Sequence, residues 1–324
     1  MPDPVLFLTA GAASAVVSAA LMLLLGRPWS APRSVRTEIG SVLGVGLGFY
    51  VGCWVLGITV GWPLPSRDRA QDLDRLLLVV IPAVMLSELL AAAPGKFRFV
   101  ASAVRLFIMV GTVRVLLDSS IYITDVAGPG TREWTAGDAL CVFVGTAAAL
   151  AAAWGALSRL SLRSQGRSLP LVLVAACAGA ALCVMLSGYM RGGQVGIPLA
   201  GALVGASTAS LVLKNSVAPT GVVGIGTVGL FAILVIGRFY GSLTTLNAAL
   251  LFFGPVCCWL LEVPPRFIGV ARLGLVSCLM LIAVIYAGRK FVEDSAPNAK
   301  SATREPVASG QREVTAEDYL NYGT

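Results

Sequence analysis

The chain has 324 residues, of which 56% are hydrophobic and 13% are charged. Soluble domains carry roughly 25% charged residues, so this composition excludes a water-soluble globular fold. The net charge of +7 does not indicate nucleic-acid binding, because the Lys and Arg residues stand in short clusters between apolar runs and form no basic face with interleaved aromatic residues.

Ten apolar runs follow one another, each near the roughly 20 residues that cross a hydrocarbon core of about 30 Å. They lie at about 4–25, 38–62, 76–93, 99–119, 138–157, 169–190, 195–213, 221–237, 246–262 and 269–288. The runs lack the alternation of a membrane barrel, and a helix satisfies its own backbone groups in lipid. We therefore predict an all-α integral membrane protein. Residues 1–288 would form a polytopic bundle of about ten transmembrane helices, with the lipid bilayer as its main partner.

The second run contains the stretch GSVLGVGLGFYVG, with a glycine at every fourth position. Four residues advance a helix by about 400°, so these glycines share one face. In lipid, repeated small residues at this spacing are typical of helix packing, because they let two backbones approach closely. The helix-packing residues expected in this run are Gly40, Gly44, Gly48 and Gly52, and Gly201, Gly205 and Ala209 form a weaker example in the seventh run. A permeation path lined by bare backbone is the alternative.

A few ionisable residues fall inside the apolar runs, where they are costly enough to be functional hypotheses. Glu88 is an intramembrane acid deep in the third run, and it is expected to be protonated or bonded to a neighbouring helix. Arg105 shares a helix face with Arg98, so we expect it to extend to the same interface. Arg114 has Asp118 one turn away and is expected to pair with it.

A candidate ligand site follows from the ten-span count, which puts all even-numbered loops on one side. The segments LSGYMRGGQVG and IGRFYGSLTTLN each place an Arg near a Tyr and glycines at the end of a span. Such groups are suited to an anionic or polar ligand. The ligand-binding candidates are Arg114, Arg191, Arg238, Tyr189 and Tyr240, and the hypothesis requires the three arginines to border one polar cavity. Ordinary anchoring of span ends by Arg and Tyr is the competing interpretation.

Catalytic and cofactor motifs are scarce. The chain has no histidine, which removes imidazole metal sites and His-based triads, and its seven cysteines form no CxxC pair. The stretch GIGTVG at 224–229 matches a dinucleotide fingerprint, but it lies inside an apolar run and the next acidic residue is Glu262. We therefore expect no metal, no cofactor and no catalytic residues.

The loop charges conflict about orientation. Lys and Arg are shared equally between the odd-numbered loops and the even-numbered loops taken with the tail. The early loops favour an outside N-terminus and the tail favours an inside C-terminus, which ten spans cannot both satisfy. Either one run does not cross, or the bias is weak.

Residues 289–324 form a polar tail rich in Ala, Ser and Pro, which has too little apolar content to bury a core. We predict disorder, with a docking peptide for a protein partner as the alternative. The candidate peptide is VTAEDYLNYGT, in which Thr315 would cap a short helix that presents Tyr319 and Leu320.

Three function classes remain. The first is a non-catalytic component of a membrane assembly, with the glycine stripe and the tail as contact surfaces. The second is a transporter or permease for a small polar or anionic solute. An intramembrane enzyme is disfavoured by the missing histidine and the scarce acids. The expected location is the cell membrane, in a bacterium the inner membrane.

Overall fold

The computed structural model describes residues 3–26, 33–58, 72–93, 97–118, 120–123, 133–163, 168–213, 220–260 and 268–295. Within these ranges the chain forms helices joined by turns, and no strand. The chain divides into two units, Met1–Gly288 and Arg289–Thr324, and each is considered by itself. The predicted docking peptide and most of the predicted tail lie outside the described residues.

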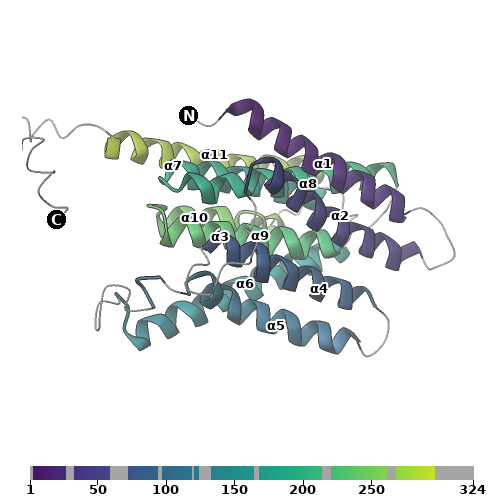
Figure 1. The fold of residues 1–324 in the computed structure, drawn as a ribbon, viewed down its shortest axis with the longest axis horizontal. Helices are drawn as coiled ribbons and strands as arrows, with labels where there is room; N and C mark the ends of the chain where they lie inside the picture. The colour runs from purple at the N-terminus through teal and green to yellow at the C-terminus, as the bar shows by residue number, and fades with distance from the viewer. Residues whose placement is uncertain are drawn as a thin grey trace, which may run out of the picture. The chain divides into compact units, whose positions relative to one another are not determined.

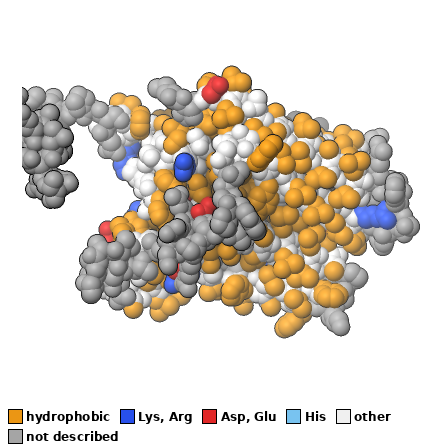
Figure 2. Space-filling view, in the orientation of Figure 1, with side chains coloured by type: hydrophobic (Ala, Val, Ile, Leu, Met, Phe, Trp, Pro, Cys, Tyr) orange, Lys and Arg blue, Asp and Glu red, His pale blue; other side chains and the backbone are white. Residues whose placement is uncertain are grey.

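The helices follow the apolar runs in order. They are α1 (Pro4–Gly26), α2 (Arg33–Val55), α3 (Asp72–Arg75), the π-helical turn η1 (Leu76–Val80), α4 (Ile81–Ala92), α5 (Phe97–Leu116), α6 (Ala136–Arg163), α7 (Ser168–Leu186), α8 (Met190–Val212), α9 (Thr220–Phe239), α10 (Thr245–Phe253), the 3-10 helix η2 (Val256–Leu260) and α11 (Ile268–Ser295). In the described part of the chain, nine helical segments are long and apolar enough to cross a membrane. This confirms the predicted all-α, multi-spanning architecture. Figure 2 shows apolar side chains over most of the face in view.

The ninth apolar run differs from the others, because it holds only the shorter apolar segment Thr245–Trp259. The chain nevertheless passes from one end of the bundle to the other between α9 and α11. Asn247, at the start of α10, donates to the carbonyl of Ala283, past the middle of α11, whereas Gly269 at the start of α11 lies beside Ser168 at the start of α7. Helix α8 begins where α7 ends, and α1 runs parallel to α8 (Figure 1), because Gly11 lies beside Gly201 and Gly26 beside Leu213. The start of α1 and Ala283 of α11 therefore lie at the same end. Of the two explanations for the conflicting loop charges, this arrangement favours a weak bias.

Helix α9 is the centre of the bundle, with α2, α4, α5, α6, α7, α8 and α10 packed around it. It is apolar around its whole circumference, as expected for a helix without a solvent face. Glycines let the neighbours come close: a Cβ atom on Gly229 would lie 2.6 Å from the Leu199 side chain. The GIGTVG stretch is thus part of a continuous buried helix.

The glycine stripe of α2 lies against α1, and we call this contact the α1 seam. A Cβ atom would stand 2.8 Å from the Ser18 carbonyl oxygen if placed on Gly44, and 2.7 Å from the Ser14 carbonyl oxygen if placed on Gly48. The buried residues of α1 repeat every four positions in turn: Ala10, Ser14, Ser18, Met22 and Gly26. Two small-residue stripes therefore face each other with their backbones in contact.

A second helix contacts α1 in the same way, and we include it in the α1 seam. Cβ atoms on Gly201 and Gly205 of α8 would overlap the carbonyl groups of Gly11 and Ala15. The weaker small-residue stripe of the seventh run thus also lies against α1. That the stability of the fold depends on these contacts stays a prediction.

Candidate ligand-binding site

One end of the bundle gathers polar side chains from helices that are distant in sequence; we call it the tyrosine end. Gly188 adopts a φ of 86°, in the left-handed region that favours glycine, and so allows α7 and α8 to join through three residues. The backbone N–H of Ser242 donates to the Ser187 carbonyl at 2.8 Å. This bond holds the turn beside the end of α9, where Tyr189 and Tyr240 stack with their ring centroids 6.1 Å apart.

Both tyrosine hydroxyls are hydrogen-bond donors to another part of the chain. The Tyr189 hydroxyl lies 2.9 Å from each carboxylate oxygen of Asp72, the buried first residue of α3. The Tyr240 hydroxyl donates to the Leu116 carbonyl at 3.0 Å. Burial, and then the negative charge of Asp72, raises the pKa of Tyr189 well above its usual range and raises that of Tyr240 to about 12. Both hydroxyls therefore keep their protons at physiological pH.

Two arginines bond to Asp118 beside these tyrosines. Arg75 is buried, and its guanidinium donates to the backbone carbonyl of Asp118, just after the end of α5. Carbonyls at a helix C-terminus have no partner within the helix, and a cation there also interacts favourably with the helix dipole. The Asp118 side chain accepts from Arg114 at 2.6 Å, so the expected ion pair is present. We call Asp72, Arg75, Asp118, Tyr189 and Tyr240 the polar cluster.

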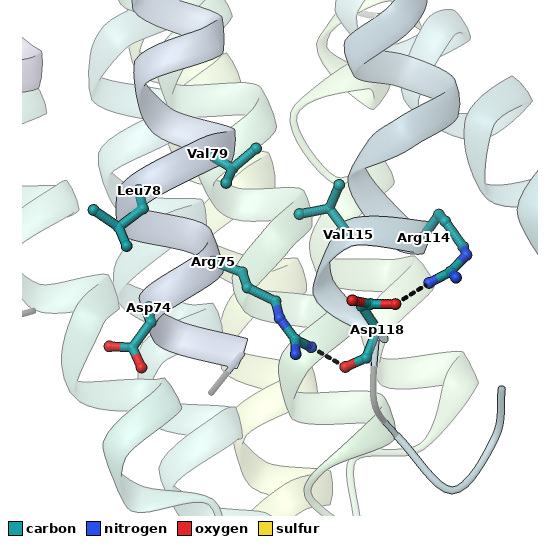
Figure 3. Close-up of a pocket in the computed structure, with 7 residues that line it drawn as sticks. All are labelled: Asp74, Arg75, Leu78, Val79, Arg114, Val115 and Asp118. Atoms are coloured by element: carbon teal, nitrogen blue, oxygen red, sulfur yellow. Dashed lines mark hydrogen bonds and ion pairs between the residues drawn. The ribbon is translucent and has the colours of Figure 1, made fainter. Parts of the chain in front are cut away.

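A pocket of about 490 Å³ opens beside the polar cluster, between α3–η1 and the end of α5 (Figure 3). Its lining residues are Asp74, Arg75, Leu78, Val79, Arg114, Val115 and Asp118. The apolar side chains lie deeper along the two helices, and the charged ones lie toward the tyrosine end. Along this rim the charges alternate in sign, in the order Asp74, Arg75, Asp118 and Arg114.

The π-helical turn η1 shapes one wall of the pocket. The N–H of Ile81 donates to the Leu76 carbonyl five residues earlier, as in a π-helix. The next residue, Pro82, has no N–H to offer the Leu77 carbonyl. The hydroxyl of Tyr50 in α2 donates to that carbonyl instead. Single π-turns are frequent at functional sites, and this one presents Leu78 and Val79 on the outer surface.

The five ligand-binding candidates separate into two sets. Arg114 lines the pocket, and Tyr189 and Tyr240 belong to the polar cluster beside it. Arg191 is exposed at the start of α8. Arg238 donates to the Thr245 hydroxyl at 2.9 Å and lies over the Phe239 ring at 5.7 Å. Neither Arg191 nor Arg238 is among the residues that line this pocket.

Sequence reasoning missed the acid and the arginine at the start of the third run. In the segment DLDR, Asp72 binds Tyr189 and Arg75 binds the end of α5. The available signal was a pair of acids and an Arg directly before an apolar run. That pattern is also the ordinary composition of a span end, so it did not distinguish these residues from interfacial ones.

A second polar contact lies toward the opposite end of the bundle. The Arg105 guanidinium is 2.7 Å from the Glu88 carboxylate, whose side chain is 0% exposed, and it lies 5.4 Å from the centroid of the Trp154 ring. Glu88 also lies against Gly224 of α9. Within the described residues, Glu88 Oε1, Arg105 Nε and Trp154 Nε1 are buried without a hydrogen-bond partner. The expectation that Arg105 extends to the interface with Arg98 is therefore wrong, because an unpaired buried carboxylate would cost more than drawing the guanidinium inward.

Within the described residues, no group of three His, Cys, Asp or Glu side chains is placed to hold a metal ion. Comparison of the chain with protein-family models, with curated proteins and with solved structures finds no match in any of the three.

Proposed function

We propose that this multi-pass membrane protein is a non-catalytic component of a membrane assembly in the cell membrane, the inner membrane if the host is a bacterium. The supporting observation is the bonding of the polar cluster. Tyr189 binds Asp72, Tyr240 binds the end of α5, and Arg75 binds the same end. These contacts tie α3, α5, α8 and α9 in one arrangement. Side chains used in this way suit a rigid framework better than an alternating solute path.

The surface offered to a partner is narrower than the sequence suggests. The glycine stripe of α2 is covered by α1 of the same chain, so it is not a contact surface for another protein. The polar tail is the remaining contact segment in this proposal. Its residues Tyr319 and Leu320 are the anchors we expect a partner to bind.

The experiment compares the full chain with a chain that ends at residue 295 and with a chain in which residues 296–324 are scrambled. Each is extracted from its native membrane in mild detergent and analysed by light scattering and quantitative mass spectrometry. We expect the full chain to carry a partner at fixed stoichiometry, and both variants to lose it while melting at the same temperature. Three particles of identical mass and composition would contradict the proposal.

Transport of a small polar or anionic solute is the second candidate, favoured by the buried Glu88–Arg105 pair. Ionisable groups at membrane depth often mark solute or proton paths, and these two retain unbonded polar atoms beside the central helix. Purified protein in liposomes would be tested for flux of a panel of small anions and zwitterions. Flux that is lost in Glu88→Gln and kept in Arg191→Gln would favour transport over the assembly role.

A further inference from the structure

The pocket beside the polar cluster has an apolar wall and a charged rim, in the same order as the acyl chains and headgroup of a lipid in a bilayer leaflet. It lies between the ends of two segments that can cross the membrane, Asp72–Ala92 and Phe99–Leu116. Its deeper wall is apolar, with Leu78 39% and Val79 47% exposed on the outer surface of the bundle. Its charged rim stands at the end of both segments (Figure 3). The ends of membrane-spanning helices are the parts that meet the layer of lipid headgroups.

We propose that this pocket binds one phospholipid of the surrounding leaflet, whose headgroup carries both a phosphate and a primary amine. One acyl chain would lie along Leu78, Val79 and Val115, and the headgroup along the charged rim. This inference is independent of the assembly role.

The alternation of charge selects the headgroup. The rim holds two carboxylates and two guanidinium groups, so its formal charges cancel. A purely anionic headgroup would meet the carboxylates of Asp74 and Asp118 as well as the arginines. A headgroup with both charges can place its phosphate on Arg114 and its ammonium on the neighbouring carboxylate of Asp118, and the two carbons between phosphate and amine suit such adjacent partners. A primary amine offers three N–H donors to a carboxylate, whereas a trimethylated amine offers none.

Arg114 can bind the phosphate of the lipid while it keeps its ion pair with Asp118. Its side chain is 44% exposed, and Nη1 is the atom that meets Asp118. A guanidinium has five N–H donors and often binds phosphate through two of them. The remaining donors of Arg114 are therefore available to a phosphate at the rim.

The polarity of the pocket, rather than its size, argues against a free polar solute. A volume of about 490 Å³ falls within the roughly 300–1,000 Å³ typical of small-molecule sites, but a whole phospholipid exceeds it. The pocket thus takes the headgroup and the first part of one chain, and the rest of the lipid stays in the bilayer. The apolar wall would leave a small polar solute without hydrogen bonds on that side.

Native mass spectrometry of the delipidated full chain in detergent is the test, with phosphatidylethanolamine, phosphatidylglycerol and phosphatidylcholine of identical chains as probes. We expect one phosphatidylethanolamine to bind about tenfold more tightly than the other two lipids. Arg114→Gln should weaken that binding about tenfold, and Val79→Trp should abolish it by filling the pocket. The matched controls are Arg191→Gln, an exposed arginine outside the pocket, and Leu246→Trp, an exposed apolar residue of α10. Both should bind like wild type.

A second measurement uses the unmodified chain, in case Arg114→Gln does not fold. A photoreactive phosphatidylethanolamine in vesicles should crosslink to peptides that contain residues 74–79 and 114–118. Equal affinity for the three lipids, equal loss in the control variants, or crosslinks spread evenly over the outer helices would overturn the proposal. Equally tight binding of glycerophosphoethanolamine or inorganic phosphate would also overturn it, because the ligand would then be a soluble polar molecule.

Discussion

The α1 seam and the polar cluster hold helices together by opposite means. In the α1 seam, glycines of α2 and α8 remove side chains, so that backbone carbonyls of α1 are covered at van der Waals distance. In the polar cluster, long side chains reach between helices and bond through charged and hydroxyl groups. Apolar side chains gain little by leaving lipid for one another, so close packing and hydrogen bonds are the two remaining sources of helix association.

The two regions are expected to differ in how well they tolerate amino-acid substitutions. At Gly44, Gly48, Gly201 and Gly205 the α1 seam cannot adjust by a side-chain rotation, because the atom nearest to an added Cβ is a backbone atom of α1. The contacts of the polar cluster are made by side chains, so a substitution there can remove a hydrogen bond without forcing two helix backbones apart. We therefore expect single substitutions to be far more damaging in the α1 seam than in the polar cluster.

The largest effect is expected from Gly44→Leu and Gly48→Leu. Each new side chain would start less than 3 Å from a carbonyl oxygen of α1, so α1 and α2 must separate. We expect little folded protein in detergent, measured by fluorescence-detected size exclusion. Gly145→Leu is the matched control, because a Cβ atom there meets nothing within 4 Å. If both seam variants accumulate and melt like the control, the contrast between the two regions is lost.

A smaller effect is expected from Tyr189→Phe in the polar cluster. The change removes the donor to Asp72 and leaves that buried carboxylate with one bond fewer, which typically costs about 1–3 kcal/mol. The variant should fold and melt several degrees lower in a thermal scan in detergent. Tyr286→Phe, on a half-exposed tyrosine of α11, should melt like wild type. If Tyr189→Phe fails to fold, the polar cluster is as sensitive to substitution as the α1 seam.

The π-turn allows a test of whether one hydrogen-bond donor to the Leu77 carbonyl can replace another. Tyr50→Phe should lower the free energy of unfolding by about 1 kcal/mol, because the Leu77 carbonyl loses its hydrogen bond from the Tyr50 hydroxyl. In a Pro82→Ala background the new N–H of residue 82 can bond to the carbonyls one turn earlier, so the same change should cost less. A double-mutant cycle on thermal stability measures this coupling. Strictly additive effects would show that the new N–H of residue 82 does not replace the Tyr50 hydroxyl.

The smallest effect concerns pH and Tyr240. Its pKa is about 12 in the folded protein and 10 in an unfolded chain, so the neutral hydroxyl stabilises the fold fully below pH 10. That contribution is lost as the pH rises from about 10 to 12, because the unfolded chain ionises first. We expect Tyr240→Phe to lower stability by about 1 kcal/mol at pH 8, and the difference from wild type to shrink by pH 11. A difference in stability between Tyr240→Phe and wild type that grows with pH would contradict this prediction.

The spans were predictable because hydrophobic length is a local property of the sequence. The same holds for the Arg114–Asp118 pair, whose members are four residues apart on one helix. The stripe of small residues on α1 could also have been read, since Ala10, Ser14 and Ser18 repeat at the spacing of the glycines in α2.

The polar cluster was not predictable in the same way. Tyr189 and Asp72 are 117 residues apart, and Arg75 and Asp118 are 43 residues apart. Nothing local distinguishes such residues from ordinary interfacial ones, because their role depends on which helix ends meet. Glu88 and Arg105 are 17 residues apart and lie on successive helices, but the helix face that Arg105 shares with Arg98 indicated the membrane interface and not a bond to Glu88.

The double contact of α1 constrains the order of events during biosynthesis. The hairpin of α1 and α2 can form as soon as both have entered the membrane, because their stripes are adjacent in the sequence. The carbonyl of Gly11 is covered by Gly201, which the ribosome adds 190 residues later. At roughly 5–20 residues per second, α1 waits on the order of 10–40 s before its second partner exists. During that interval the face of α1 that will contact α8 lacks its partner helix, so a chain stalled before α8 should be a ready substrate for membrane quality-control proteases.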